Sequence, residues 1–138
     1  MTENIVKTIL LNAPIEKVWA TVSTADSIAT WFMPNDFQPI EGHAFTLQSP
    51  FGPSPCRVEK VDAPHFLHFI WDNDGWFVTF ELKEVGAQTE FTLTHGGWKE
   101  DTHIIPKANM SVEAVRKNMD GGWTMIIGQK LKQAVETP

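Results

Sequence analysis

The sequence of 138 residues contains one cysteine, no tyrosine and no apolar run as long as a membrane span. Because Cys56 has no second thiol to pair with, an intramolecular disulfide and a multi-cysteine zinc site are excluded. A transmembrane helix needs roughly 18 or more apolar residues, so no membrane contact is expected. The first residues also lack the basic region and apolar stretch of a secretory signal, which predicts a cytoplasmic location.

Positive charge is scarce as well. Eleven lysines and arginines stand against seventeen aspartates and glutamates, which leaves a net charge of −6 at pH 7. This charge opposes binding to a phosphate backbone, so nucleic acid is not expected as a partner.

The short motifs of common catalytic and cofactor sites are also missing. The sequence contains no His-Glu-x-x-His, no dinucleotide or phosphate-loop glycine pattern and no Gly-x-Ser-x-Gly. The pair His65 and His68 lacks convergent metal-ligand spacing. The sequence therefore predicts no metal, no cofactor and no serine nucleophile.

Large aromatic rings are what the sequence has in excess, with six tryptophans and nine phenylalanines. A chain of this length is expected to form a single domain over residues 1–138 and to bury a substantial core. So many rings exceed what a small core ordinarily needs, and of these side chains only tryptophan carries a polar atom.

Hydrophobic spacing divides the chain into strands and helices. Residues 3–11 predict a first strand, and two short helices follow, one beginning at Pro14 and one ending before Pro34. Alternating apolar residues and turn signals predict strands at about 43–49, 56–62, 66–72, 76–84 and 88–95. A short stretch near 36–39 would make a seventh strand. Cys56 lies among the alternating residues, so we expect a buried, unreactive thiol.

The C-terminal residues 111–135 return to helical spacing and predict one long amphipathic helix. Gly121 and Gly122 lie in its middle, where each glycine costs up to about 1 kcal/mol relative to alanine. Two explanations are open: the helix breaks there, or another surface approaches too closely for a side chain. Together these elements predict an α+β fold, in which a curved antiparallel sheet of about six or seven strands wraps around this helix.

Several short motifs occur in the order found in a known superfamily. They include Ala13-Pro14-x-Glu16-x-Val18-Trp19, Trp31-Phe32, Gly42-x-x-Phe45, Leu67-x-Phe69-x-Trp71, Thr92-Leu93-Thr94-His95 and Gly122-Trp123. Over residues 5–135 the sequence resembles the START-like superfamily, also called the SRPBCC or helix-grip fold. Within it, the sequence is most similar to the branch of the activator of heat-shock-protein-ninety ATPase. The resemblance implies a hydrophobic ligand cavity between sheet and helix, but no single activity.

The expected concave face, its rim and the covering helix supply the candidate ligand-binding residues. These are Trp31, Phe45, Phe69, Trp71, Val78, Phe80, Leu93, His95, Trp98, Met119, Trp123 and Ile126. His95 is the best polar candidate, because an inward imidazole can bind a ligand or act as a general base near neutral pH. The alternative is a core or rim histidine bonded to the backbone. No acid partner is visible at a fixed spacing, so no catalytic residue is predicted.

Three functions are compatible with these observations. The first is a cytoplasmic protein that binds a hydrophobic small molecule, either lipid-like or aromatic. The second is a cyclase- or hydrolase-type enzyme that uses His95 and a second polar group such as Arg57, Glu59 or Asp72. The third is a module that contacts a chaperone ATPase, as the family name suggests. The absence of tyrosine hydroxyls favours binding over catalysis.

Overall fold

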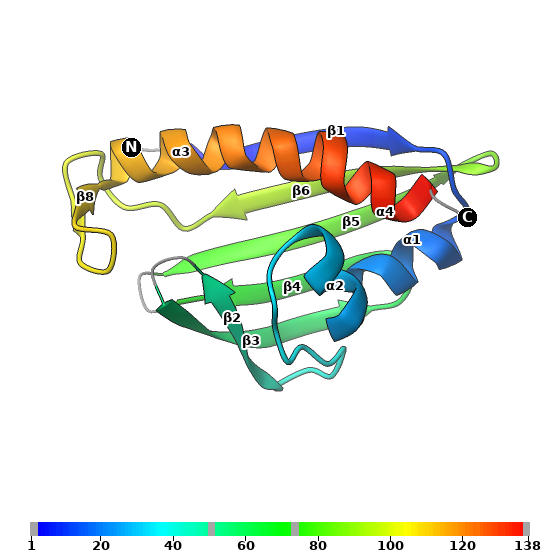
Figure 1. Ribbon diagram of the computed structural model, residues 1–138, viewed down its shortest axis with the longest axis horizontal. Helices are drawn as coiled ribbons and strands as arrows, with labels where there is room; N and C mark the ends of the chain where they lie inside the picture. Colours follow the sequence, from blue (N-terminus) through cyan, green and yellow to red (C-terminus); the bar gives the residue numbers. More distant parts are fainter. Residues whose placement is uncertain (1–2, 50–51, 73–74, 137–138) are drawn as a thin grey trace.

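A computed structural model describes residues 3–49, 52–72 and 75–136. It contains a six-stranded antiparallel sheet, two short helices after the first strand and a long C-terminal helix (Figure 1). The strands are β1 (Ile5–Leu11), β2 (Ala44–Ser49), β3 (Gly52–Asp62), β4 (Phe66–Trp71), β5 (Trp76–Val85) and β6 (Gln88–Gly96). The helices are α1 (Ile15–Val22), α2 (Ala25–Trp31), α3 (Val112–Met125), the π-helical segment η1 (Ile126–Leu131) and α4 (Lys132–Glu136). The predicted α+β, helix-grip architecture is confirmed.

Strands β2 to β6 form an antiparallel meander, and β1 is added at its β6 edge. The order in the sheet is β1-β6-β5-β4-β3-β2, and every neighbouring pair is antiparallel. β1 pairs with β6 in the register Ile5↔His95. Side chains of a strand alternate between two faces, and the buried residues of β6 include Phe91, Leu93 and His95, as the alternation predicted.

Two stretches differ from the sequence-based expectation. β3 begins at Gly52 and includes Pro53 and Pro55, whereas the sequence predicts this strand only from about residue 56; residues 50–51 lie outside the described residues. Residues 52–55 pair with β2 alone, because β4 joins β3 only from Cys56 onward. A strand without a neighbour on one side tolerates proline, which has no N–H to donate. Residues 36–39 form no strand.

The long helix contradicts both explanations offered for its glycine pair. Helix α3 continues through Gly121 and Gly122, so there is no break at this point. A Cβ added at either glycine would meet nothing within 4 Å, so no neighbouring surface requires a bare backbone there. The irregularity comes later in the helix, at the six-residue π-helical segment η1, which leads directly into α4.

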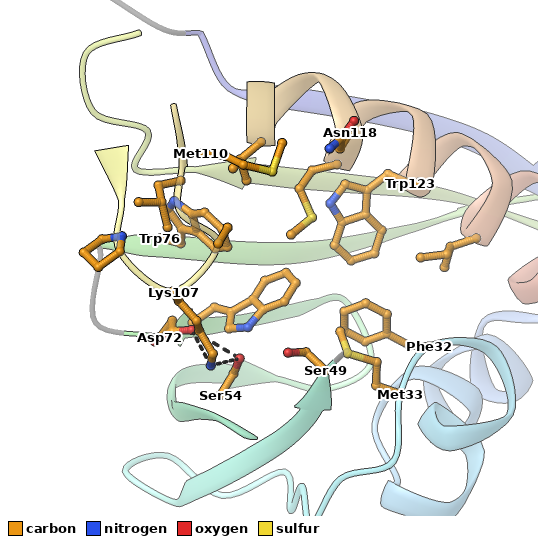
Figure 2. Close-up of a pocket in the computed structure, with 18 residues that line it drawn as sticks. Phe32, Met33, Ser49, Ser54, Asp72, Trp76, Lys107, Met110, Asn118 and Trp123 are labelled. Carbon is orange, nitrogen blue, oxygen red and sulfur yellow. Dashed lines mark hydrogen bonds and ion pairs between the residues drawn. The ribbon is translucent and has the colours of Figure 1, made fainter. Parts of the chain in front are cut away.

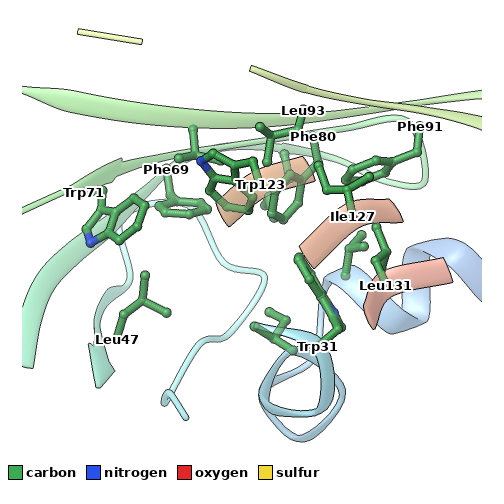
Figure 3. Packing of buried hydrophobic residues seen from close by; sticks show 14 of the residues in the cluster. Trp31, Leu47, Phe69, Trp71, Phe80, Phe91, Leu93, Trp123, Ile127 and Leu131 are labelled. Atoms are coloured by element: carbon green, nitrogen blue, oxygen red, sulfur yellow. The ribbon is translucent and has the colours of Figure 1, made fainter. Parts of the chain in front are cut away.

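The C-terminal helix covers the sheet, and its α3 part lies beside the edge formed by β1. The Arg116 guanidinium donates a hydrogen bond from Nε to the carbonyl oxygen of Glu3 at 2.7 Å, and Lys7 on β1 forms an ion pair with Asp120 at 2.6 Å. In Figure 3 the buried side chains of Trp123, Ile127 and Leu131 lie near those of Phe80, Phe91 and Leu93. Among the described residues, no helix is both long enough and apolar enough to cross a membrane.

We predict that Gly97→Ala destabilises the fold more than Gly86→Ala does. Both glycines have positive φ, +81° and +62°, so both substitutions introduce backbone strain of roughly 1–3 kcal/mol. A Cβ on Gly97 would also overlap the carbonyl oxygen of Gly75, whereas one on Gly86 meets nothing within 4 Å. Urea unfolding of the two variants measures the difference, and equal losses of stability would contradict the close approach of the two backbones.

Candidate functional site

A cavity of about 580 Å³ lies under α3 at one end of the sheet (Figure 2). Its walls are formed by Phe32, Met33, Ser49, Ser54, Trp71, Asp72, Trp76, Ile105, Pro106, Lys107, Ala108, Met110, Val115, Asn118, Met119, Gly122, Trp123 and Ile126. Small-molecule sites in proteins measure about 300–1,000 Å³ and are lined mostly by apolar and aromatic side chains. The cavity has the size and lining of such a site.

Five parts of the chain build the walls. Trp71 ends β4 and Trp76 begins β5, and the two residues pair across these strands. Two indoles therefore lie at one end of the sheet, with ring centroids 5.5 Å apart. α3 supplies the opposite wall with Met119 and Trp123. The small hairpin of β7 (Ile104–Ile105) and β8 (Met110–Ser111) closes a further side. Ser49 of β2, Ser54 of β3 and the residues after α2 complete the wall.

The twelve predicted ligand-binding residues divide into three groups. Trp71, Met119, Trp123 and Ile126 line the large cavity. Phe45, Phe69 and Phe80 line a second void of only about 10 Å³, which is too small for a ligand. Trp31, Val78, Leu93, His95 and Trp98 line neither space and are buried in the core.

Sequence reasoning missed most of the cavity wall. Trp76 carries a usable signal, because it shares the alternation of Val78 and Phe80, which were named. Phe32 lies in the Trp31-Phe32 motif and stacks on Trp123, with ring centroids 5.0 Å apart. For the hairpin residues 105–110 the sequence offers no periodic signal, since they lie between the last long strand and the helix.

His95 lies behind the cavity, at the centre of four tryptophans. Its Nδ1 accepts a hydrogen bond from Trp123 Nε1 at 3.0 Å, and Trp98 Nε1 donates to the His95 carbonyl oxygen at 2.9 Å. The ring centroids of Trp71, Trp76 and Trp98 lie 5.2, 5.1 and 4.5 Å from that of His95. The side chain is fully buried, and its Nε2 has no hydrogen-bond partner among the described residues.

These surroundings keep the imidazole neutral. Burial, and secondarily the positive charge of Arg116, lowers the pKa of His95 from 6.5 to about 3. A neutral ring whose Nδ1 accepts a hydrogen bond carries its proton on Nε2. The His95 ring forms no part of the cavity wall. It contributes to the wall indirectly, by holding the Trp123 indole in place through their hydrogen bond.

A polar cluster occupies one side of the otherwise apolar cavity. Lys107 Nζ donates to Asp72 Oδ2 at 3.0 Å, to Ser54 Oγ at 2.9 Å and to the Pro53 carbonyl oxygen at 2.8 Å. Ser54 Oγ in turn donates to Asp72 Oδ2 at 3.2 Å. The side chains of Lys107 and Asp72 are 28% and 18% exposed, so the cluster lies where the cavity meets solvent. Asp72 has a φ of 63°, a left-handed conformation that aspartate tolerates better than most residues.

Reactive thiol and metal chemistry find no site in the described part of the chain. The predicted burial of Cys56 is confirmed, and burial raises the pKa of its thiol to about 12, which keeps it protonated at neutral pH. Within residues 3–49, 52–72 and 75–136, no three histidine, cysteine, aspartate or glutamate side chains gather as a metal-binding group.

Comparisons with known proteins agree on one family. The family model described as Activator of Hsp90 ATPase homolog 1-like protein matches residues 12–136. Protein BH1534 of Bacillus halodurans is 49% identical, with a TM-score of 0.91 and 98% of both chains covered.

More distant structures share the fold. Aha1 of Colwellia psychrerythraea, solved as a dimer, is 20% identical, with a TM-score of 0.80 over 98% of this chain and 97% of that one. CalU16 of Micromonospora echinospora is 21% identical, with a TM-score of 0.75 over 96% of this chain and 76% of that one. No curated protein matches the chain.

We predict that His95 makes stability fall as the solution is acidified. A group whose pKa is lower in the folded protein binds more protons when unfolded, so the unfolding free energy falls between about pH 6.5 and pH 3. The contribution approaches about 1.4 kcal/mol per pH unit. His95→Asn, which keeps an acceptor near the position of Nδ1, should remove this slope in urea titrations at pH 5 to 7. The exposed His65→Asn is the matched control, and equal slopes in all three proteins would contradict the assignment.

Proposed function

Because this chain belongs to the family of Activator of Hsp90 ATPase homolog 1-like proteins, a branch of the START-like superfamily of ligand-binding domains, we propose that it binds a hydrophobic small molecule, lipid-like or aromatic. The proposed site is the cavity of about 580 Å³ beneath α3. The observation that carries the proposal is this apolar, ligand-sized space, which the protein's own side chains leave unfilled. Protein interiors are otherwise packed nearly as densely as organic crystals.

The helix contributes to the open space by omitting a side chain. Gly122 lines the cavity, and a Cβ placed there would meet nothing within 4 Å. A glycine inside a helix costs up to about 1 kcal/mol relative to alanine. Packing on the sheet does not explain this cost, because no neighbouring atom approaches closely. A bound molecule would use the room that the missing side chain leaves.

The tryptophans of the lining should make binding of a small molecule detectable by fluorescence. Trp71, Trp76 and Trp123 supply three indoles that a bound molecule would contact. Removing apolar surface from water contributes about 25 cal/mol per Å², from which the ordering of the ligand must be subtracted. Affinity would therefore come mainly from apolar burial, and binding would change the tryptophan fluorescence.

The geometry favours binding over the enzyme hypothesis built on His95. A general base must come within hydrogen-bond reach of its substrate, whereas His95 lies behind the wall with Nδ1 already bonded to Trp123. The chaperone-ATPase contact stays a prediction, which co-purification and stimulation of the chaperone's ATPase would test. The cytoplasmic location also stays a prediction.

We predict that Gly122→Leu abolishes or strongly weakens binding of the neutral fluorescent probe N-phenyl-1-naphthylamine. The leucine side chain would occupy the cavity without meeting protein atoms at its Cβ, so the fold should persist. Titration of the probe, followed by its own emission and by tryptophan quenching, measures the effect. We expect at least a tenfold rise in Kd, since filling the site removes the apolar contacts that supply affinity.

Gly121→Leu is the matched control. Gly121 is the residue of α3 directly before Gly122. It is exposed and lies outside the cavity wall. Both substitutions replace a helical glycine with the same good helix former, so they share the effect on helix stability. If both variants bind the probe like the unaltered protein, or if the unaltered protein does not bind it, the cavity is not the binding site.

A further inference from the structure

The cluster of Ser54, Asp72 and Lys107 constrains the polar group of the ligand. These residues lie on one side of the cavity in Figure 2, and Phe32 and Met33 lie on another. A molecule lying across the cavity would therefore have one end against apolar side chains and the other end near the cluster. The hydrogen bonds within the cluster determine which polar group of a ligand the cluster can bind.

Lys107 already uses its three N–H donors within the protein. An ammonium group has three N–H donors, and those of Lys107 match the Pro53 carbonyl oxygen, Ser54 Oγ and Asp72 Oδ2 at 2.8 to 3.0 Å. Its charge is balanced by Asp72, the partner in the ion pair. Among the described residues that line the cavity, these two are the ones with charged side chains, so the wall is electrically neutral.

The cluster still has acceptor capacity. The Ser54 hydroxyl uses its proton toward Asp72 and one lone pair toward Lys107, which leaves its second lone pair open. Asp72 Oδ2 already accepts hydrogen bonds from Ser54 and Lys107, so the open acceptor of the cluster is the one on Ser54. The cluster is therefore suited to accept a hydrogen bond from a ligand and unsuited to donate one to a ligand.

We infer that the cavity selects neutral amphipathic molecules whose polar group donates a hydrogen bond, such as an alcohol, over carboxylates of the same shape. A ligand carboxylate would meet the Asp72 carboxylate without a free cation to compensate it, and like charges in a partly buried site repel. An ether of equal length would fill the apolar part but would leave the open acceptor of the cluster unmatched. The inference rests on the proposed function and adds the chemical class of the ligand.

The test displaces bound N-phenyl-1-naphthylamine with decan-1-ol, its methyl ether, decanoate and decylammonium, and repeats the series on a 2-naphthylethyl skeleton. In the unaltered protein we expect the alcohol to displace the probe at a concentration about tenfold lower than the ether or the carboxylate requires. A carboxylate or an ether that competes as well as the alcohol would overturn the inference. So would the failure of every compound in both series to displace a probe that does bind.

Two charge variants should change the order of preference. Asp72→Asn keeps a residue that tolerates φ of 63° and leaves the Lys107 cation unbalanced, so decanoate should overtake the alcohol. Lys107→Met removes the ammonium group of the ion pair and gives the cluster a net negative charge, so decylammonium should gain. The control Glu84→Gln removes the same charge from an exposed position on β5 outside the cavity and should leave the order unchanged.

The results separate the two proposals. If Asp72→Asn still binds the probe but keeps the preference of the unaltered protein, the cluster does not determine which polar group is bound. The inference is then wrong, while the proposed function stands. If the probe binds Gly122→Leu as well as it binds the unaltered protein, the proposed function fails and the inference falls with it.

Discussion

The hydrogen bond between Trp123 and His95 joins the long helix to the sheet, and the cavity depends on where it holds that helix. Trp123 lies on α3 and His95 near the end of β6, so this buried contact of 3.0 Å links two layers of the fold by a specific pair of atoms. The bond requires an imidazole that accepts at Nδ1, because a protonated ring has only donors. Burial supplies this condition by lowering the pKa of His95 to about 3.

The surplus of aromatic rings follows from the same arrangement. Trp71, Trp76, Trp98 and Trp123 surround the imidazole, and three of these four also line the cavity. Each indole of this kind serves as a rigid wall on one side and as packing for the buried histidine on the other. A phenol in the same place would bring a hydroxyl that needs a partner when buried. The absence of tyrosine fits an interior in which few such partners exist.

The alternation of apolar residues could identify the inward face of the sheet but not the depth at which a side chain lies along it. Leu93 and Trp71 both satisfy the pattern, yet Leu93 is packed in the core while Trp71 lines the cavity. Leu93 lies inside β6, whereas Trp71 is the last residue of β4, at the end of the sheet where the cavity lies. Lys107 could not be predicted as a wall residue, because its position depends on the fold of a short hairpin and on three hydrogen bonds to residues more than 30 positions away.

What the sequence alone determined is the order of elements, the antiparallel meander, the covering helix and the superfamily, since these follow from local spacing and from motifs read in order. Tertiary structure decided which rings pack and which stay open, that His95 is a buried acceptor, and that Gly122 faces empty space. It also placed Asp72, Ser54 and Lys107 together at the cavity. These properties depend on contacts between segments distant in the chain, and such contacts leave no periodic trace in the sequence.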